Sequence, residues 1–223
     1  MIDARDILFA YPAAAFSLEI SALQVGRGET VALVGPSGCG KTTLLQLLAG
    51  VEVPQSGALT VAGAEWSGMT RAARQAHRLG RIGLVPQNFE LLDYLTVREN
   101  ILLPCRLGSA LGAARDREER CLSLSERAGI ERHLSKYPGQ LSQGERQRAA
   151  LCRGLIGQPE LILADEPTGN LDPENQDRIV ALLLDEAKMI DATVVMVTHE
   201  PSLLPRFDRA LDLRDLCKKE VGV

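Results

Sequence analysis

Two kinds of hydrophobic pattern alternate along this chain, and each predicts a different kind of structure. Continuous apolar runs occur at residues 30–34, 161–164 and 193–198, and short runs of this kind are typical of buried parallel strands. Residues 81–85 form a fourth candidate strand, which Pro86 closes. Parallel strands are normally covered by helices on both faces, so this pattern predicts an α/β core.

Shorter segments near the N-terminus follow a different rule. Residues 7–9, 16–20 and 58–62 are candidate strands of a small antiparallel sheet. From about residue 91 to 157 the strand signals disappear, and charged helical stretches such as 113–128 take over. We therefore predict one domain over residues 1–223, with an α/β core at approximately 1–90 and 156–223. A helical subdomain at approximately 91–155 is inserted into it.

A glycine-rich string follows the first apolar strand of the core. Residues 35–43 read GPSGCGKTT and match the pattern G-x-x-x-x-G-K-[ST], and helix-forming sequence continues to Ala49. Backbone N–H groups of such a loop surround phosphates, and the helix N-terminus adds its positive dipole end. The predicted nucleotide-binding residues are Gly35, Pro36, Ser37, Gly38, Cys39, Gly40, Lys41, Thr42 and Thr43. Lys41 is expected to reach the β and γ phosphates, and the Thr42 hydroxyl to bind Mg²⁺.

Two adjacent carboxylates end the apolar run at 161–164. Asp165 is a candidate Mg²⁺ ligand, because magnesium prefers oxygen donors and keeps several waters. Glu166 is a candidate general base for an attacking water. Taken alone, such a pair is often only the end of a strand, but downstream of a phosphate loop it favours a catalytic role.

A capping box begins one helix of the predicted helical subdomain. Ser142 and Glu145 have the S-x-x-E spacing, so Ser142 is expected to start the helix that runs through Gln147 and Ala150. The free N–H groups and the positive end of this helix would then face outward.

Composition narrows the classes of protein that fit. The formal net charge of −4 and the pI of about 5.5 disfavour general nucleic-acid binding. No apolar stretch approaches the roughly 18 residues of a membrane span, and the N-terminus lacks a signal-peptide pattern. The five cysteines form no C-x-x-C pair, which is typical of buried thiols in a reducing compartment. These features predict a cytosolic protein.

Read in order, the motifs resemble the nucleotide-binding domain of ATP-binding cassette (ABC) proteins over nearly the whole chain. The resemblance implies a P-loop NTPase core, ATP and Mg²⁺ as ligands, and a role for each motif. Tyr11 matches the aromatic that stacks on adenine, although a core tyrosine is the open alternative. Gln87 matches the glutamine that contacts Mg²⁺ and water, and His199 the switch histidine at the γ-phosphate. The other matches are the Walker A loop at 35–43, the signature segment at 141–145, the Walker B pair Asp165 and Glu166, and the D-loop at 169–172, which ends in Asp172.

The signature segment departs from the common LSGGQ form. Gln143 replaces the first glycine and Glu145 replaces the glutamine. In the family, two domains bind head to tail around two ATP molecules. The resemblance therefore implies that Ser142, Gln143, Gly144 and Glu145 contact the nucleotide held by a second copy.

The resemblance implies an ATPase subunit of an ABC transporter, at the cytoplasmic face of the inner membrane, with membrane permease subunits on separate chains. The segments 141–148, 164–172 and 95–104 look like the lipoprotein-releasing and macrolide-exporter branch. Two alternatives stay open: a soluble ABC ATPase acting on DNA or the ribosome, and a catalytically silent regulatory module. The absence of a long coiled coil and the presence of Lys41, Glu166 and His199 argue against them.

The segment that follows Gln87 is rich in large apolar residues. Phe89, Leu91, Leu92, Tyr94 and Leu95 either pack inside the helical subdomain or line a groove for a short helix of the permease. The resemblance favours the groove.

Overall fold

The central element of the fold is a five-stranded parallel sheet. The computed structural model describes residues 1–12, 16–108, 113–169 and 171–217. The strand order is β6-β7-β8-β3-β9, and every neighbouring pair is parallel. The strands are β6 (Ile82–Val85), β7 (Leu161–Asp165), β8 (Thr193–Val197), β3 (Thr30–Val34) and β9 (Arg209–Asp212). The three strands predicted from apolar runs and the candidate strand at 81–85 are confirmed, and β9 is an addition.

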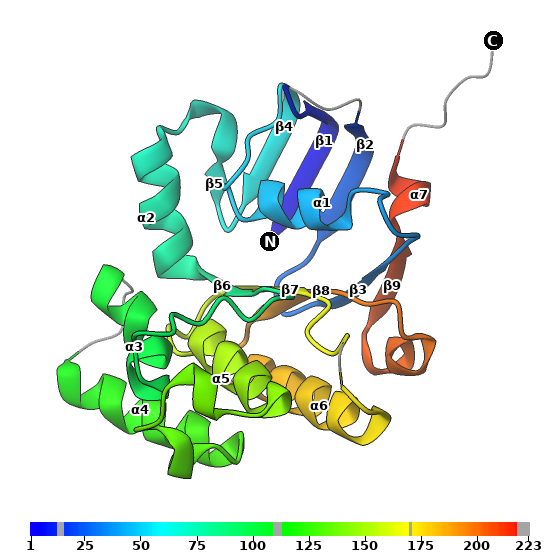
Figure 1. The fold of residues 1–223 in the computed structure, drawn as a ribbon. Helices are drawn as coiled ribbons and strands as arrows, with labels where there is room; N and C mark the ends of the chain where they lie inside the picture. Colours follow the sequence, from blue (N-terminus) through cyan, green and yellow to red (C-terminus); the bar gives the residue numbers. More distant parts are fainter. Residues whose placement is uncertain (13–15, 109–112, 170, 218–223) are drawn as a thin grey trace.

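A second, antiparallel sheet lies above the parallel one (Figure 1). Its order is β2-β1-β4-β5, with strands β1 (Ile2–Ala10), β2 (Ser17–Val25), β4 (Ser56–Val61) and β5 (Ala64–Glu65). The helix α1 (Lys41–Leu48) lies between the two sheets, and Leu44, Leu47 and Leu48 are buried there. The predicted antiparallel sheet is confirmed, with longer strands than the alternation indicated.

Helices cover the lower face of the parallel sheet: α3 (Val97–Leu107), α4 (Ala114–Arg127), α5 (Gln143–Leu155) and α6 (Pro173–Met189). Successive side chains of a strand point to opposite faces. Ile162 and Ala164 accordingly pack with the helices below, whereas Leu161 and Leu163 pack with α1 above. Burial on both faces explains why β7 is apolar throughout.

The helix α2 (Arg71–Arg81) was not predicted. None of its residues is fully buried, and Arg74 and Arg78 are half-buried beside the end of α1, so it lacks the buried apolar stripe that marks an ordinary packed helix. Arg74 and Arg78 donate to the carbonyls of Ala49 and Gly50, at the end of α1. These bonds satisfy carbonyl groups that a helix C-terminus leaves free.

The remaining helical elements are short. They are η1 (Trp66–Gly68), η2 (Glu131–His133), η3 (Pro138–Gln140), η4 (Pro201–Arg206) and α7 (Leu213–Leu216). Within the described ranges, no helix is both long enough and apolar enough to cross a bilayer.

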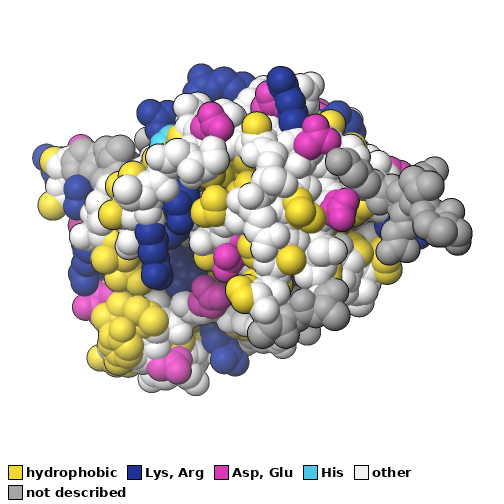
Figure 2. Space-filling model, turned by 90° about the horizontal axis from the view of Figure 1, so that it is seen from above, with side chains coloured by type: hydrophobic (Ala, Val, Ile, Leu, Met, Phe, Trp, Pro, Cys, Tyr) yellow, Lys and Arg dark blue, Asp and Glu magenta, His cyan; other side chains and the backbone are white. Residues whose placement is uncertain are grey.

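Basic and acidic side chains are interspersed on the face that Figure 2 presents.

Candidate functional site

The site forms where the parallel strands end. Strand β3 leads into the glycine-rich loop, β7 ends in Asp165, β6 leads to Gln87 and β8 to His199. Because parallel strands share one direction, these four segments emerge at the same edge of the sheet. In open α/β sheets this is the edge where ligands bind.

Glycine is required at two positions of the loop. Gly35 has φ +152° and Gly40 has φ +103°. A Cβ atom on Gly35 would lie 2.8 Å from Cys39 Sγ, and one on Gly40 would lie 2.8 Å from Phe16 Cζ. Both positions therefore combine a positive φ, which residues with side chains rarely adopt, with little room for a Cβ atom.

Lys41 begins α1, and its side chain turns back over the loop. Its ammonium Nζ donates to Gly35 O at 2.8 Å and to Pro36 O at 2.9 Å, and the residue is buried. An ammonium has three donors. The loop therefore positions a cation at the site where the motif predicts phosphate, with donor capacity left over.

Thr42 and Asp165 come together across 123 residues of sequence. The Thr42 hydroxyl donates to Asp165 Oδ2 at 2.8 Å. Burial raises the pKa of the Asp165 carboxyl, and the bond from Thr42 partly opposes this effect. Within the described part of the chain, no three His, Cys, Asp or Glu side chains gather as a metal centre. The oxygen donors present fit Mg²⁺, which proteins often bind through one carboxylate together with substrate phosphates.

Two side chains converge on a single oxygen of Glu166. Gln87 Nε2 donates to Glu166 Oε2 at 3.1 Å, and His199 Nδ1 lies 3.5 Å from the same oxygen. Glu166 itself has φ +44°, which is uncommon for a residue with a side chain. Such strained residues cluster at functional sites, where the surroundings hold them in place.

A cavity of about 430 Å³ joins the loop to this carboxylate. Its size is in the range of small-molecule sites. It is lined by Tyr11, Phe16, Ser37, Gly38, Gly40, Lys41, Thr42, Thr43, Gln87 and Glu166. Tyr11 and six of the nine predicted loop residues therefore lie together around this cavity.

Tyr11 packs against its neighbours and also lines the cavity. Its hydroxyl donates to Gln46 Oε1 at 2.8 Å, and its ring packs edge-on against Phe9 at 4.8 Å between centroids. The residue is half-buried, and its contact with adenine stays a prediction. Phe16 also lines the cavity and was not predicted as a site residue. The available signal was an aromatic residue directly before β2 and five positions after Tyr11 in the sequence.

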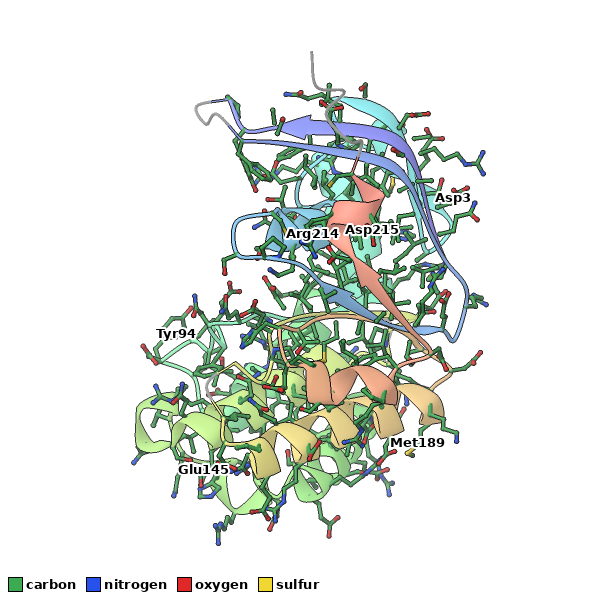
Figure 3. All side chains as sticks on the ribbon, turned by 90° about the vertical axis from the view of Figure 1, so that its right-hand side faces the viewer. Asp3, Tyr94, Glu145, Met189, Arg214 and Asp215 are labelled. Atoms are coloured by element: carbon green, nitrogen blue, oxygen red, sulfur yellow. The ribbon has the colours of Figure 1, made fainter. Side chains whose placement is uncertain are left out.

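The signature segment does not reach this cavity. The Ser142 side chain accepts from Glu145 N, and Glu145 Oε2 accepts from Ser142 N at 2.8 Å, so the predicted capping box is confirmed. Ser142, Gln143, Gly144 and Glu145 are all missing from the cavity lining among the described residues. Figure 3 places Glu145 low in the helical layer.

The D-loop residue Asp172 also lies outside the cavity lining. It caps α6 by accepting from Asn175 N at 3.0 Å. Asn170 lies outside the described residues.

Replacing Ser142 with alanine is expected to destabilise the fold by about 1 kcal/mol, because an N-cap bond is lost. The hydrogen bond from the backbone N–H of Ser142 lowers the pKa of Glu145. The ionised Glu145 side chain therefore adds to the free energy of unfolding at pH values above its ordinary pKa. That contribution disappears as the pH falls through the lowered native value. Urea unfolding at pH 7 and in acid measures both effects. Ser123→Ala, at an exposed position inside α4, is the control; an equal loss there would contradict the capping role.

The chain resembles known proteins along most of its length. The family model described as ABC transporter matches residues 18–169. The lipoprotein-releasing system ATP-binding protein LolD of Legionella pneumophila (strain Paris) is 39% identical over 193 residues, which cover 86% of this chain and 84% of the relative. LolD of Psychrobacter arcticus is 40% identical over 193 residues, covering 86% and 85%.

Solved structures agree with this likeness. The dimeric structure of a post-hydrolysis state of the ATP-binding cassette MJ0796 bound to ADP and Pi has a TM-score of 0.88 and 29% identity, covering 99% of this chain and 97% of that one. A second dimeric structure of MJ0796, described as a bacterial ABC transporter cassette, has a TM-score of 0.85 and 30% identity, with 96% and 95% covered.

Proposed function

The chain belongs to the ABC transporter family, and on this premise we propose that it is the ATP-hydrolysing subunit of a lipoprotein-releasing type of system. One observation carries the catalytic part of the proposal: Gln87 and His199 meet at Glu166, on the wall of the cavity that the phosphate loop lines. A regulatory module without catalysis would not need this arrangement.

The geometry supports a division of roles within the site. Loop N–H groups and Lys41 bind and orient the phosphates, and Glu166 accepts a proton from water attacking the γ-phosphorus. Gln87 and His199 orient the Glu166 carboxylate and the water. Thr42, Asp165 and Gln87 would hold Mg²⁺, which supplies positive charge to the phosphate oxygens when it is bound. Tyr11 and Phe16 would contact the base.

The position of the signature helix supports a dimer. Ser142 and Gln143 are exposed, and the N-terminal residues of α5 are not part of the described lining of their own cavity. A helix N-terminus favours anions, so we propose that it meets the γ-phosphate held by a second copy. The two MJ0796 structures named above are dimeric. Residues of approximately 91–155 would move as the unit that carries this helix.

A groove of about 570 Å³ supports contact with membrane subunits. It runs from Gln87 to the C-terminal half of α3, and its apolar lining includes Val51, Leu103, Pro104 and Leu107. None of the five apolar residues from Phe89 to Leu95 is part of the described lining, so this groove differs from the predicted one, and a role for those residues in permease binding stays a prediction. Asn100 explains the difference, because its buried amide bonds to Leu92 and Leu95 and holds that segment to α3.

We propose that this groove receives a cytoplasmic segment of the permease and holds the chain at the cytoplasmic face of the inner membrane. Leu107→Glu is expected to abolish co-purification with the permease, because Leu107 is 60% exposed at the groove. Folding and basal ATP hydrolysis should be unchanged. Leu122→Glu is the control, since Leu122 is 46% exposed on α4 and lies away from the groove. Unchanged co-purification of a folded Leu107→Glu variant would exclude the groove.

The lipoprotein-release function has its own test. The tagged chain is purified from native membranes, and the membrane subunits that accompany it are reconstituted with it in vesicles containing a lipoprotein. ATP-dependent release of the lipoprotein is the expected result. ATP hydrolysis without release would retain the ATPase and reject this cargo.

A further inference from the structure

A strained turn follows Gln87 directly. Phe89 has φ +57° and Glu90 has φ +49°, so two consecutive residues with side chains are left-handed. Such conformations persist only when the surrounding structure holds them. The turn also contains a short bond from Glu90 N to Asn88 O. Whatever holds this turn therefore also determines where Gln87 lies.

Arg153 holds the turn from a different part of the chain. It lies on α5, the helix that begins with the signature segment. Its guanidinium donates to Phe89 O and to Glu90 O, each at 2.6 Å. These two residues lie more than 60 positions before Arg153 in the sequence. Burial lowers the pKa of Arg153, but arginine remains a cation, and its planar fork fits two acceptors at once.

The backbone next to Arg153 also packs tightly against the strand that leads to Gln87. A Cβ atom on Gly83 would lie 2.2 Å from Gly154 O, and one on Gly154 would lie 2.8 Å from Val85 Cγ2. Helix α5 and strand β6 therefore touch through two glycines. Because there is little free space between α5 and β6, a movement of α5 would be passed on to the segment that carries Gln87.

We propose that Arg153 is a positioning residue for ATP hydrolysis: it holds the Phe89–Glu90 turn so that Gln87 reaches Glu166. Arg153 thereby connects α5, whose N-terminus is proposed to contact the partner's nucleotide, to the Gln87 and Glu166 side chains of its own chain. The inference rests on the proposed roles of Gln87 and Glu166.

The test is a double-mutant cycle on the full chain. Arg153→Met should lower kcat by about 10- to 100-fold with KM for ATP nearly unchanged, because positioning errors act on the chemical step. Gln87→Ala should also lower kcat. If Arg153 acts through Gln87, the double variant is no slower than the slower single variant. Effects that multiply would overturn the proposal.

The controls separate this proposal from the proposed function. Arg98→Met removes an arginine of α3 that makes an exposed ion pair with Glu118, and it should leave kcat unchanged. If Gln87→Ala leaves kcat unchanged, the roles of both Gln87 and Arg153 are wrong. If Gln87→Ala slows hydrolysis and Arg153→Met does not, only the positioning role fails.

A milder variant and a structural measurement complete the test, in case Arg153→Met folds poorly. Arg153→Lys retains the charge and can bond to one carbonyl, so it should recover part of the lost kcat. Hydrogen exchange of residues 87–92 should be faster in Arg153→Met, intermediate in Arg153→Lys and normal in Arg98→Met. Normal exchange in a folded Arg153→Met variant would contradict the link to the turn.

Discussion

Replacing Lys41 with alanine is expected to abolish measurable ATP hydrolysis and to weaken ATP binding strongly. Its Nζ is held over the phosphate loop by Gly35 O and Pro36 O, so the charge is in place before the nucleotide arrives. Preorganised charge of this kind contributes most in the transition state, and removing one donor commonly costs about 100- to 1,000-fold in kcat. A further loss of ground-state binding is expected, because the loop supplies no other charged side chain.

The measurement is steady-state ATPase activity together with equilibrium binding of a fluorescent ATP analogue. Lys188→Ala, at an exposed position near the end of α6, is the matched control. Thermal melting should show that the Lys41 variant is folded, since the two carbonyls it leaves can bond to water. Near-normal hydrolysis by a folded Lys41→Ala protein would refute the assignment of the loop as the phosphate site.

Glu166→Gln is expected to slow hydrolysis by about 100- to 10,000-fold, the range usual for a general base, while leaving ATP binding intact. Glutamine has nearly the same shape, and its amide oxygen can still accept from Gln87 Nε2. Because ATP then persists in the site, the variant should accumulate as an ATP-bound dimer. Size-exclusion chromatography with light scattering detects this directly.

Adding Ser142→Arg to Glu166→Gln should prevent that dimer. Ser142 is exposed at the start of α5, so the arginine places bulk where the partner's phosphate would lie. Glu174→Gln, in an exposed ion pair on α6, controls for the loss of one carboxylate and should hydrolyse ATP normally. A dimer of unchanged yield in the double variant would show that the two copies do not associate through the signature helix.

The elements that sequence patterns predicted well are those whose causes are local. The Ser142 capping box closes within four residues, and Asp172 caps α6 within the same distance. The strands β3, β7 and β8 are apolar because both of their faces are buried, which is visible without knowing their neighbours. Helix α2 was missed because it packs through arginine hydrogen bonds, which hydrophobic periodicity does not record.

By itself, the sequence determined the phosphate loop, the helix caps, the buried strands and the order of the motifs, because each depends on residues adjacent along the chain. Only the tertiary structure decided which of these residues meet. The strand order places Thr42 beside Asp165 and Gln87 beside Glu166. The Asn100 amide holds Leu92 and Leu95 against α3. Helix α5 places Arg153 at the turn that follows Gln87. These contacts join residues that are between 5 and 123 positions apart. The long-range ones depend on how sheets and helices pack, which no local pattern specifies.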